Sequence, residues 1–119
     1  MIEAVYHRKH HRLTLKGHAN SGEPGHDLVC ASASILAYTL ASAVMGMSET
    51  KHIRDPKVIL NEGSAEISCC PLTGYKATVQ LAFDSICAGY QLLAHDFPEN
   101  ISFKIVGAGI ETLQPDLIP

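Results

Sequence analysis

The sequence is poor in charge and lacks several patterns that would assign it to a common functional class. Charged residues make up 18% of its 119 residues, and the formal net charge is −3, whereas about a quarter of an average globular chain is charged. This balance predicts neither a basic nucleic-acid-binding face nor an acidic tail, so no direct nucleic-acid partner is expected. A surface with so little charge could be partly covered by a second copy of the chain, and we therefore expect a homodimer.

Recognisable cysteine motifs and a targeting segment are also missing. The cysteines have no CxxC or zinc-finger spacing, and two of the four are adjacent: Cys30, Cys69, Cys70 and Cys87. The opening residues, MIEAVYHRKHHR, have no apolar run after their basic residues and do not resemble a secretory signal. Reduced thiols in the cytoplasm are the expectation that follows.

One uncharged run, residues 28–48, is long enough to be considered as a membrane span. Its serines, threonine and glycine, together with few large aliphatic side chains, favour a core helix that is covered on more than one side. We therefore expect no membrane partner.

Hydrophobic periodicity predicts the order ββαββαβ within one domain spanning residues 1–119. The expected strands are 2–6, 13–16, 57–60, 64–70 and 101–105, and the expected helices are 28–47 and 75–95. A polar turn, HRKHHR at residues 7–12, joins the first two strands and is interpreted as a solvated hairpin tip. Two helices packed on one mixed sheet give an α/β fold of the α+β type.

Each predicted helix shows apolar residues at helical spacing. In the first helix these residues are Leu28, Ser32, Ile35, Leu36, Leu40, Ala43, Val44 and Met47. In the second helix they are Val79, Ala82, Phe83, Ile86, Tyr90, Leu93 and Ala94. Cys30 and Ser34 are four residues apart, one helical turn from each other, on a different face of the first helix.

Candidate chemistry is concentrated where a glycine-rich loop meets the first helix. The loop at 17–26 contains Gly22 and Gly25 and is expected to be mobile. Asp27 is a natural helix N-cap, which places Cys30 third in the helix, where the partial positive charge of the helix start favours the thiolate. A cysteine at that position, with His18 upstream, has the parts of an activated nucleophile.

Several assignments around Cys30 remain open from the residues alone. His18 would be the general base, and His26 is the rival base. Asp27 either caps the helix or orients His18, and Ser34 either hydrogen-bonds near the thiol or bonds back to its own helix. The competing arrangements are a metal site built from His18, His26, Asp27 and Cys30, and a purely structural Cys30 that packs as a small hydrophobic residue. The residues alone leave these alternatives open.

The run GHANSGEPGHDLVCASAS resembles the signature of the ribosomal-processing cysteine protease family, Prp. The matching positions are Gly17, His18, Gly25, Asp27, Leu28, Val29, Cys30, Ala31 and Ser34. The resemblance implies a cytoplasmic, homodimeric endopeptidase that removes an N-terminal extension from a large-subunit ribosomal protein, the one numbered twenty-seven. It also implies Cys30 as nucleophile, His18 as base, Asp27 and Ser34 as supporting residues, and a substrate loop around Gly22 and Gly25. With this resemblance we expect the enzyme, with no metal or cofactor. The alternative is a non-enzymatic, ribosome-associated interaction module in which Cys30 is structural. One departure is Ser32–Ala33, where the family more often has alanine and a branched aliphatic residue.

Overall fold

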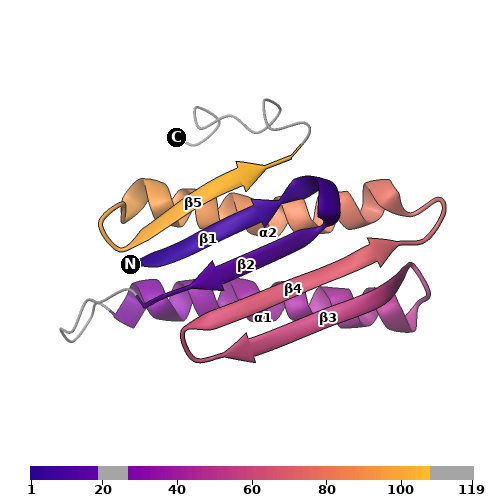
Figure 1. Ribbon diagram of the computed structural model, residues 1–119, viewed down its shortest axis with the longest axis horizontal. Coiled ribbons are helices and arrows are strands. Elements are labelled where there is room, and N and C mark those ends of the chain that lie inside the picture. The colour runs from indigo at the N-terminus through magenta and orange to yellow at the C-terminus, as the bar shows by residue number, and fades with distance from the viewer. Residues whose placement is uncertain (19–26, 108–119) are drawn as a thin grey trace.

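The computed structural model describes residues 1–18 and 27–107 and has two layers, a five-stranded sheet and two helices (Figure 1). Both helices lie on the same face of the sheet, and the opposite face is not covered by either of them. The elements are β1 (Ile2–His7), the 3₁₀ turn η1 (Arg8–His10), β2 (Arg12–Lys16), α1 (Asp27–Glu49), β3 (Ile53–Asn61), β4 (Ser64–Pro71), α2 (Lys76–Asp96) and β5 (Ile101–Val106). The predicted mixed sheet with two helices is confirmed.

The sheet has the order β3-β4-β2-β1-β5. Three neighbouring pairs are antiparallel, and only β1 and β5 run parallel. Side chains alternate between the two faces of each strand, and on β1 this turns Ile2, Ala4 and Tyr6 toward the helices, where all three are buried. The core therefore lies between the helices and one face of the sheet.

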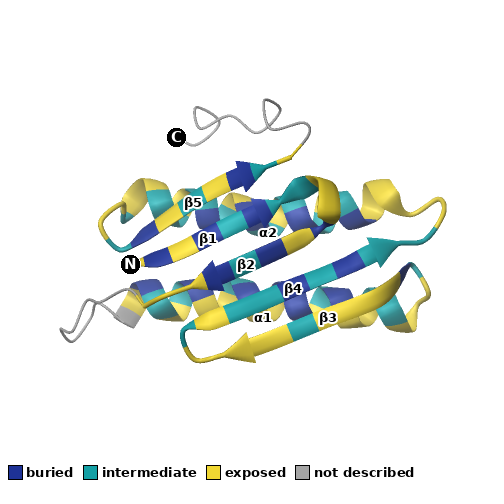
Figure 2. Cartoon of the chain, in the orientation of Figure 1, coloured by how far each residue is buried: buried dark blue, intermediate teal, exposed yellow. Residues whose placement is uncertain are grey.

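Strand β3 is longer than predicted, because it begins at Ile53 rather than at residue 57. Ile53 and Arg54 pair with the end of β4, and the register then shifts between Arg54 and Lys57. Asp55 has a φ of 53°, and Pro56 has no amide hydrogen to give to a ladder. This register shift hides the start of β3 from a search for alternating residues. The residues of β3 are also almost all exposed (Figure 2), so burial gives no pattern either.

The second helix buries the face that was predicted, whereas the first buries only part of it. Leu40 and Val44 are fully buried as predicted, but Leu28 and Ile35 were also expected inside and are 59% and 60% exposed. The inward face of α1 is completed by residues outside the predicted set: Val29, Ala33, Ala37 and Ala41. Because residues 28–48 carry no charge, hydrophobic contrast around α1 is weak and does not mark which side packs.

The histidine-rich turn is not simply a solvated tip. Lys9, His10 and Arg12 are exposed, but His11 is only 4% exposed. His11 adopts a left-handed backbone conformation with φ 49°, and its ring meets the edge of Phe83. This local reversal turns an imidazole into the core, and strand alternation gives no sign of it.

Helix α1 is also long and apolar enough to cross a bilayer by length and composition. In the fold, its inward face packs on the sheet and one flank contacts α2 through Leu36 and Gly89. These contacts account for the uncharged run as part of the core.

Candidate functional site

An open pocket of about 430 Å³ lies where β2 ends, α1 begins and the β3–β4 hairpin turns. Three segments that are distant in the sequence meet there. Its lining residues are Ile2, Leu15, Gly17, His18, Cys30, Ala33, Ser34, Ala37, Tyr38, Leu60, Asn61, Glu62, Gly63, Ser64 and Ala65. The pocket thus brings together His18, Cys30 and Ser34, three of the residues selected from the sequence.

Helix α1 places Cys30 and Ser34 on the pocket wall. Val29 is buried against the sheet, so the next residue, Cys30, lies on the flank of the helix and is half-buried. Ser34 follows one turn later and is exposed. The helix begins at Asp27 itself, so Cys30 is the fourth residue of α1 rather than the third. It still lies in the first turn, directly after the backbone amides that have no partner within the helix.

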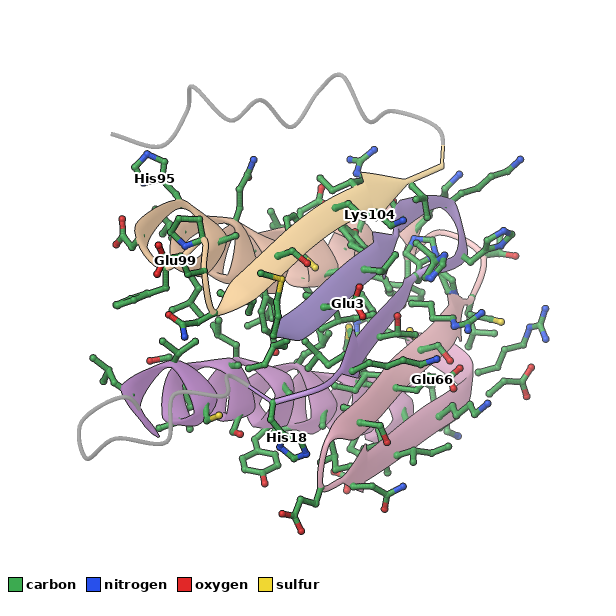
Figure 3. The ribbon with its side chains drawn as sticks, turned by 60° about the vertical axis from the view of Figure 1, so that its left-hand side comes forward. Glu3, His18, Glu66, His95, Glu99 and Lys104 are labelled. Atoms are coloured by element: carbon green, nitrogen blue, oxygen red, sulfur yellow. The ribbon has the colours of Figure 1, made fainter. Side chains whose placement is uncertain are left out.

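His18 follows the end of β2 and is held close to the β3–β4 turn. The amide of Gly17 donates a 2.9 Å hydrogen bond to the carbonyl of Gly63. The side chain of His18 is exposed and extends beside the end of the hairpin (Figure 3). Within residues 1–18 and 27–107, no hydrogen bond joins His18 to Cys30, so the two share the pocket without being paired.

Other predicted site residues fall outside the described part of the chain. These are His26, Gly22 and Gly25, together with the side chain of Asp27. The N-cap, the rival base and the substrate loop therefore remain predictions. In the described segments, no group of three or more His, Cys, Asp or Glu side chains is arranged to hold a metal ion.

Sequence reasoning missed most of the pocket wall. Ile2, Leu15 and Ala65 form an apolar part of it, and Tyr38, Leu60 and Glu62 come from α1 and the hairpin. Strand alternation predicts that Ile2 and Leu15 point inward, but the pairing of β2 with β4 decides that the hairpin turn reaches His18. Because β2 precedes α1 and β4 follows it, this pairing is a long-range contact that no local sequence pattern predicts.

Comparison with known proteins identifies the family of the chain. The family model described as cysteine protease Prp matches residues 1–102. The chain belongs to the Prp cysteine protease family. The ribosomal processing cysteine protease Prp of Staphylococcus aureus strain Mu50 is 25% identical over 89 residues, which cover 75% of this chain and 80% of that protein.

Solved structures share the fold. A crystal structure of Prp from S. aureus with a covalently linked product peptide superposes with a TM-score of 0.67 at 23% identity, covering 88% of this chain and 97% of that one. A crystal structure from Streptococcus mutans gives a TM-score of 0.65 at 28% identity, covering 89% and 94%. The α+β fold is therefore that of the Prp structures.

Within this Prp fold, the remaining cysteines differ from Cys30 in their surroundings. Cys69 and Cys87 are 3% and 1% exposed. Burial raises the pKa of Cys69 to about 11 and raises the pKa of Cys87 further. Both thiols remain protonated near neutral pH and act as packing residues of the core. Cys70 is half-buried on β4, two positions from the outward-facing Ser68, and does not line the pocket.

Proposed function

We propose that this chain is a cysteine endopeptidase in which Cys30 is the nucleophile and His18 the general base. The observation that carries the proposal is that both side chains line one pocket at the start of α1. A free thiol, an imidazole and unpartnered helix amides in one cleft are the groups that thiol-dependent acyl transfer requires. The S. aureus relative, solved with a covalently linked product peptide, is consistent with covalent catalysis in the family.

The reaction proceeds through an acyl-enzyme. His18 takes the Cys30 proton, and the thiolate attacks the scissile carbonyl carbon to form the C–S bond. Backbone amides in the first turn of α1 stabilise the oxyanion. The C–N bond then breaks as His18 returns the proton to the leaving amine. His18 then takes a proton from water, and the oxygen attacks the thioester carbonyl carbon to form a C–O bond. The C–S bond breaks as His18 returns the proton to Cys30, which releases the carboxylic acid and restores the thiol.

Supporting residues surround this pair. Ser34, which lines the pocket one turn beyond Cys30, either hydrogen-bonds near the thiol or bonds back to its own helix. Asp27, at the N-terminal end of α1, either caps the helix or orients His18. The loop carrying Gly22 and Gly25 closes over the substrate. No metal or cofactor takes part in this scheme.

The substrate we propose is the N-terminal extension of the large-subunit ribosomal protein numbered twenty-seven, which is removed in the cytoplasm to support ribosome assembly. The curated relative is named for ribosomal processing, and a further S. aureus Prp structure, at 22% identity, contains a substrate peptide. The enzyme acts as one domain over residues 1–119, without a nucleic-acid or membrane partner. The alternative is a non-enzymatic ribosome-associated module in which Cys30 is structural.

Mass spectrometry of the precursor ribosomal protein tests the activity. The wild type should produce one defined N-terminal truncation, and Cys30→Ala should produce none. Cys70→Ala is the matched control, because it removes a half-buried thiol that does not line the pocket. His18→Ala should slow the cleavage by about 10²-fold or more, as expected for loss of a general base.

Each alternative outcome has a separate meaning. Truncation by both the wild type and Cys30→Ala would indicate a contaminating protease. Absence of cleavage by the wild type would favour the structural-cysteine module. Equal cleavage by His18→Ala and the wild type would remove His18 from the mechanism and leave His26 as the candidate base.

We also propose that the homodimer forms through the outer face of the helix layer. Leu81 and Leu92 on α2 are 68% and 44% exposed, on the side opposite the buried Phe83 and Tyr90. Ile35 on the outer side of α1 is 60% exposed. Such an apolar surface, nearly free of charge, is suited to covering by a second copy.

Sedimentation equilibrium of charged variants tests this interface. Leu81→Lys and Leu92→Lys should shift the protein from dimer to monomer. Ile59→Lys is the control, because Ile59 is a similarly exposed apolar residue whose partner in the ladder is Glu66, on β4. Equal dissociation of all three variants, or no dissociation of any, would contradict the helix-layer interface.

A further inference from the structure

The imidazole of His18 occupies the space where the side chain of residue 63 would be. Gly63 lies in the turn between β3 and β4. A Cβ atom added to Gly63 would lie 2.8 Å from His18 Nε2 and 3.2 Å from Cε1. Carbon–nitrogen contacts of 2.8 Å are inside van der Waals distance, so the ring could not keep its place beside any other residue.

The backbone on both sides of this contact is fixed. Gly17 donates its amide hydrogen to the carbonyl of Gly63 over 2.9 Å, directly before His18. Gly17 has φ +98°, and a Cβ there would collide with the carbonyl oxygen of Met1. The start of β1 and the hairpin turn therefore fix the backbone of Gly17, the residue directly before His18.

We propose that Gly63 is a positioning residue for His18. Because Gly63 has no side chain, the imidazole of His18 can lie against its Cα. The hydrogen bond between Gly17 and Gly63 fixes the main chain beside it. The hairpin turn therefore determines where the imidazole lies in the pocket. Cys30 is on the α1 side of the same pocket. The turn thus sets the approach of base to nucleophile, an inference that rests on the proposed role of His18.

Two effects of a side chain at position 63 can be separated experimentally. Gly63 has φ +76°, a conformation that strains any L-residue. Gly74 has φ +92° and nothing within 4 Å of its potential Cβ, so alanine at position 74 brings the backbone strain without the collision. In Gly63→Ala the atoms that the new Cβ meets belong to the imidazole ring of His18, at the end of a side chain. The ring is therefore expected to move.

The experiment compares Gly63→Ala, Gly74→Ala and the wild type. The substrate is a synthetic peptide spanning the N-terminal extension of the ribosomal protein. Gly63→Ala should lower kcat by about tenfold or more with a smaller change in KM, because the base is displaced while the pocket remains. It should also alter the pH profile of Cys30 alkylation by iodoacetamide. Gly74→Ala should retain the wild-type kcat and pH profile, although its melting temperature falls.

A third readout does not depend on peptide cleavage. The ring resonances of His18, assigned by their loss in His18→Gln, should shift in Gly63→Ala and stay in place in Gly74→Ala. If Gly63→Ala fails to fold, Gly63→Asn replaces it, because asparagine tolerates positive φ while still introducing a Cβ. Unmoved His18 resonances and a wild-type alkylation profile in the folded variant would overturn the proposal. If the wild type cleaves nothing, the proposed function fails, and the resonances still decide the role of Gly63.

Discussion

The hydroxyl of Tyr90 donates a 2.7 Å hydrogen bond to the backbone carbonyl of Ala33, and this bond joins α2 to α1 inside the core. Tyr90 is fully buried, and Ala33 lines the pocket between Cys30 and Ala37. The bond therefore links α1, which carries the proposed nucleophile, to α2.

Tyr90→Phe removes this bond and leaves the ring. The carbonyl of Ala33 is also placed to accept the ordinary helical bond from Ala37, so the loss should be close to 1 kcal/mol of unfolding free energy. Urea unfolding measures it. Tyr75→Phe is the control, because Tyr75 is 38% exposed, and it should change stability by less than about 0.5 kcal/mol. Equal stability of Tyr90→Phe and the wild type would show that the bond contributes nothing.

Gly89 on α2 lies directly against the side chain of Leu36 on α1. A Cβ there would lie 2.7 Å from Leu36 Cδ2 and 2.9 Å from Cδ1. Gly89→Ala should therefore destabilise the protein by about 1–3 kcal/mol despite the better helix propensity of alanine. Gly46→Ala, at a helical glycine with nothing within 4 Å, should instead stabilise it by about 0.5–1 kcal/mol.

A double variant tests the cause of the Gly89 effect by the same urea unfolding measurement. Combined with Leu36→Ala, Gly89→Ala should lose most of its additional penalty, because the methyl groups of Leu36 that it meets are gone. Additive penalties would show that the cost comes from elsewhere.

The arrangement of the core was predictable where sequence contrast is strong. In α2, polar residues alternate with apolar ones at helical spacing, so Val79, Phe83 and Tyr90 marked the inward face correctly. In α1 that contrast is weak, and the prediction was right for Leu40 and Val44 but wrong for Leu28 and Ile35, which are exposed. Ala33 and Ala37, which were not predicted, are buried in the core. Packing of small residues is decided by the partner surface, which a single segment does not encode.

The candidate site was predictable only in part, for a related reason. His18 and Cys30 are close in sequence, and a strand that ends near a helix start brings them to one pocket. Gly63 and Glu62 reach that pocket through the pairing of β2 with β4, a long-range choice. The burial of His11 depends on a left-handed backbone angle that no periodic pattern reveals.

Arg8 and Asp84 form a forked ion pair between η1 and α2. Arg8 donates to both carboxylate oxygens at 3.1 and 3.0 Å, and Tyr6 donates to Oδ1 at 2.7 Å. Arg8→Ala should cost about 1–3 kcal/mol at pH 7, because it leaves a partly buried carboxylate without its cation. Urea unfolding should show a loss below about 0.5 kcal/mol for Arg54→Ala, whose pair with Asp55 is exposed.

Lowering the pH should reduce the Arg8→Ala penalty. Burial of Asp84 acts to raise its pKa, but hydrogen bonds from Arg8, Tyr6 and Gln80 outweigh it and hold the pKa below the usual 3.8. A depressed carboxyl pKa gives stability that is present above 3.8 and lost as the pH falls through the lower folded value. A penalty that stays constant down to pH 2 would contradict this role for the carboxylate.

His11 should make the fold sensitive to mild acid. Burial lowers its pKa below the usual 6.5, and the charges of Lys76 and Arg8 act in the same direction. The unfolded chain then binds a proton that the folded chain does not, so stability is fully present above pH 6.5 and decreases as the pH falls below it.

Chemical denaturation of His11→Asn between pH 7.5 and 5 measures this contribution. Asparagine tolerates the positive φ at position 11 and does not titrate, so the variant should show a smaller loss of stability across the interval. Some dependence should remain, because burial also lowers the pKa of His7. Identical slopes for the variant and the wild type would exclude His11 as a source.

Alkylation should divide the four thiols into accessible and protected groups. Cys69 and Cys87 are buried and their pKa values are raised by burial, to about 11 for Cys69, so neither should react with iodoacetamide in the folded protein at pH 7.5. Cys30 and Cys70 are both half-buried and should react. If His18 assists Cys30, Cys30 should react much faster than Cys70, and His18→Ala should bring the two rates together. Peptide mapping by mass spectrometry gives each rate, and a His18→Ala variant with unchanged Cys30 labelling would separate the imidazole from the thiol.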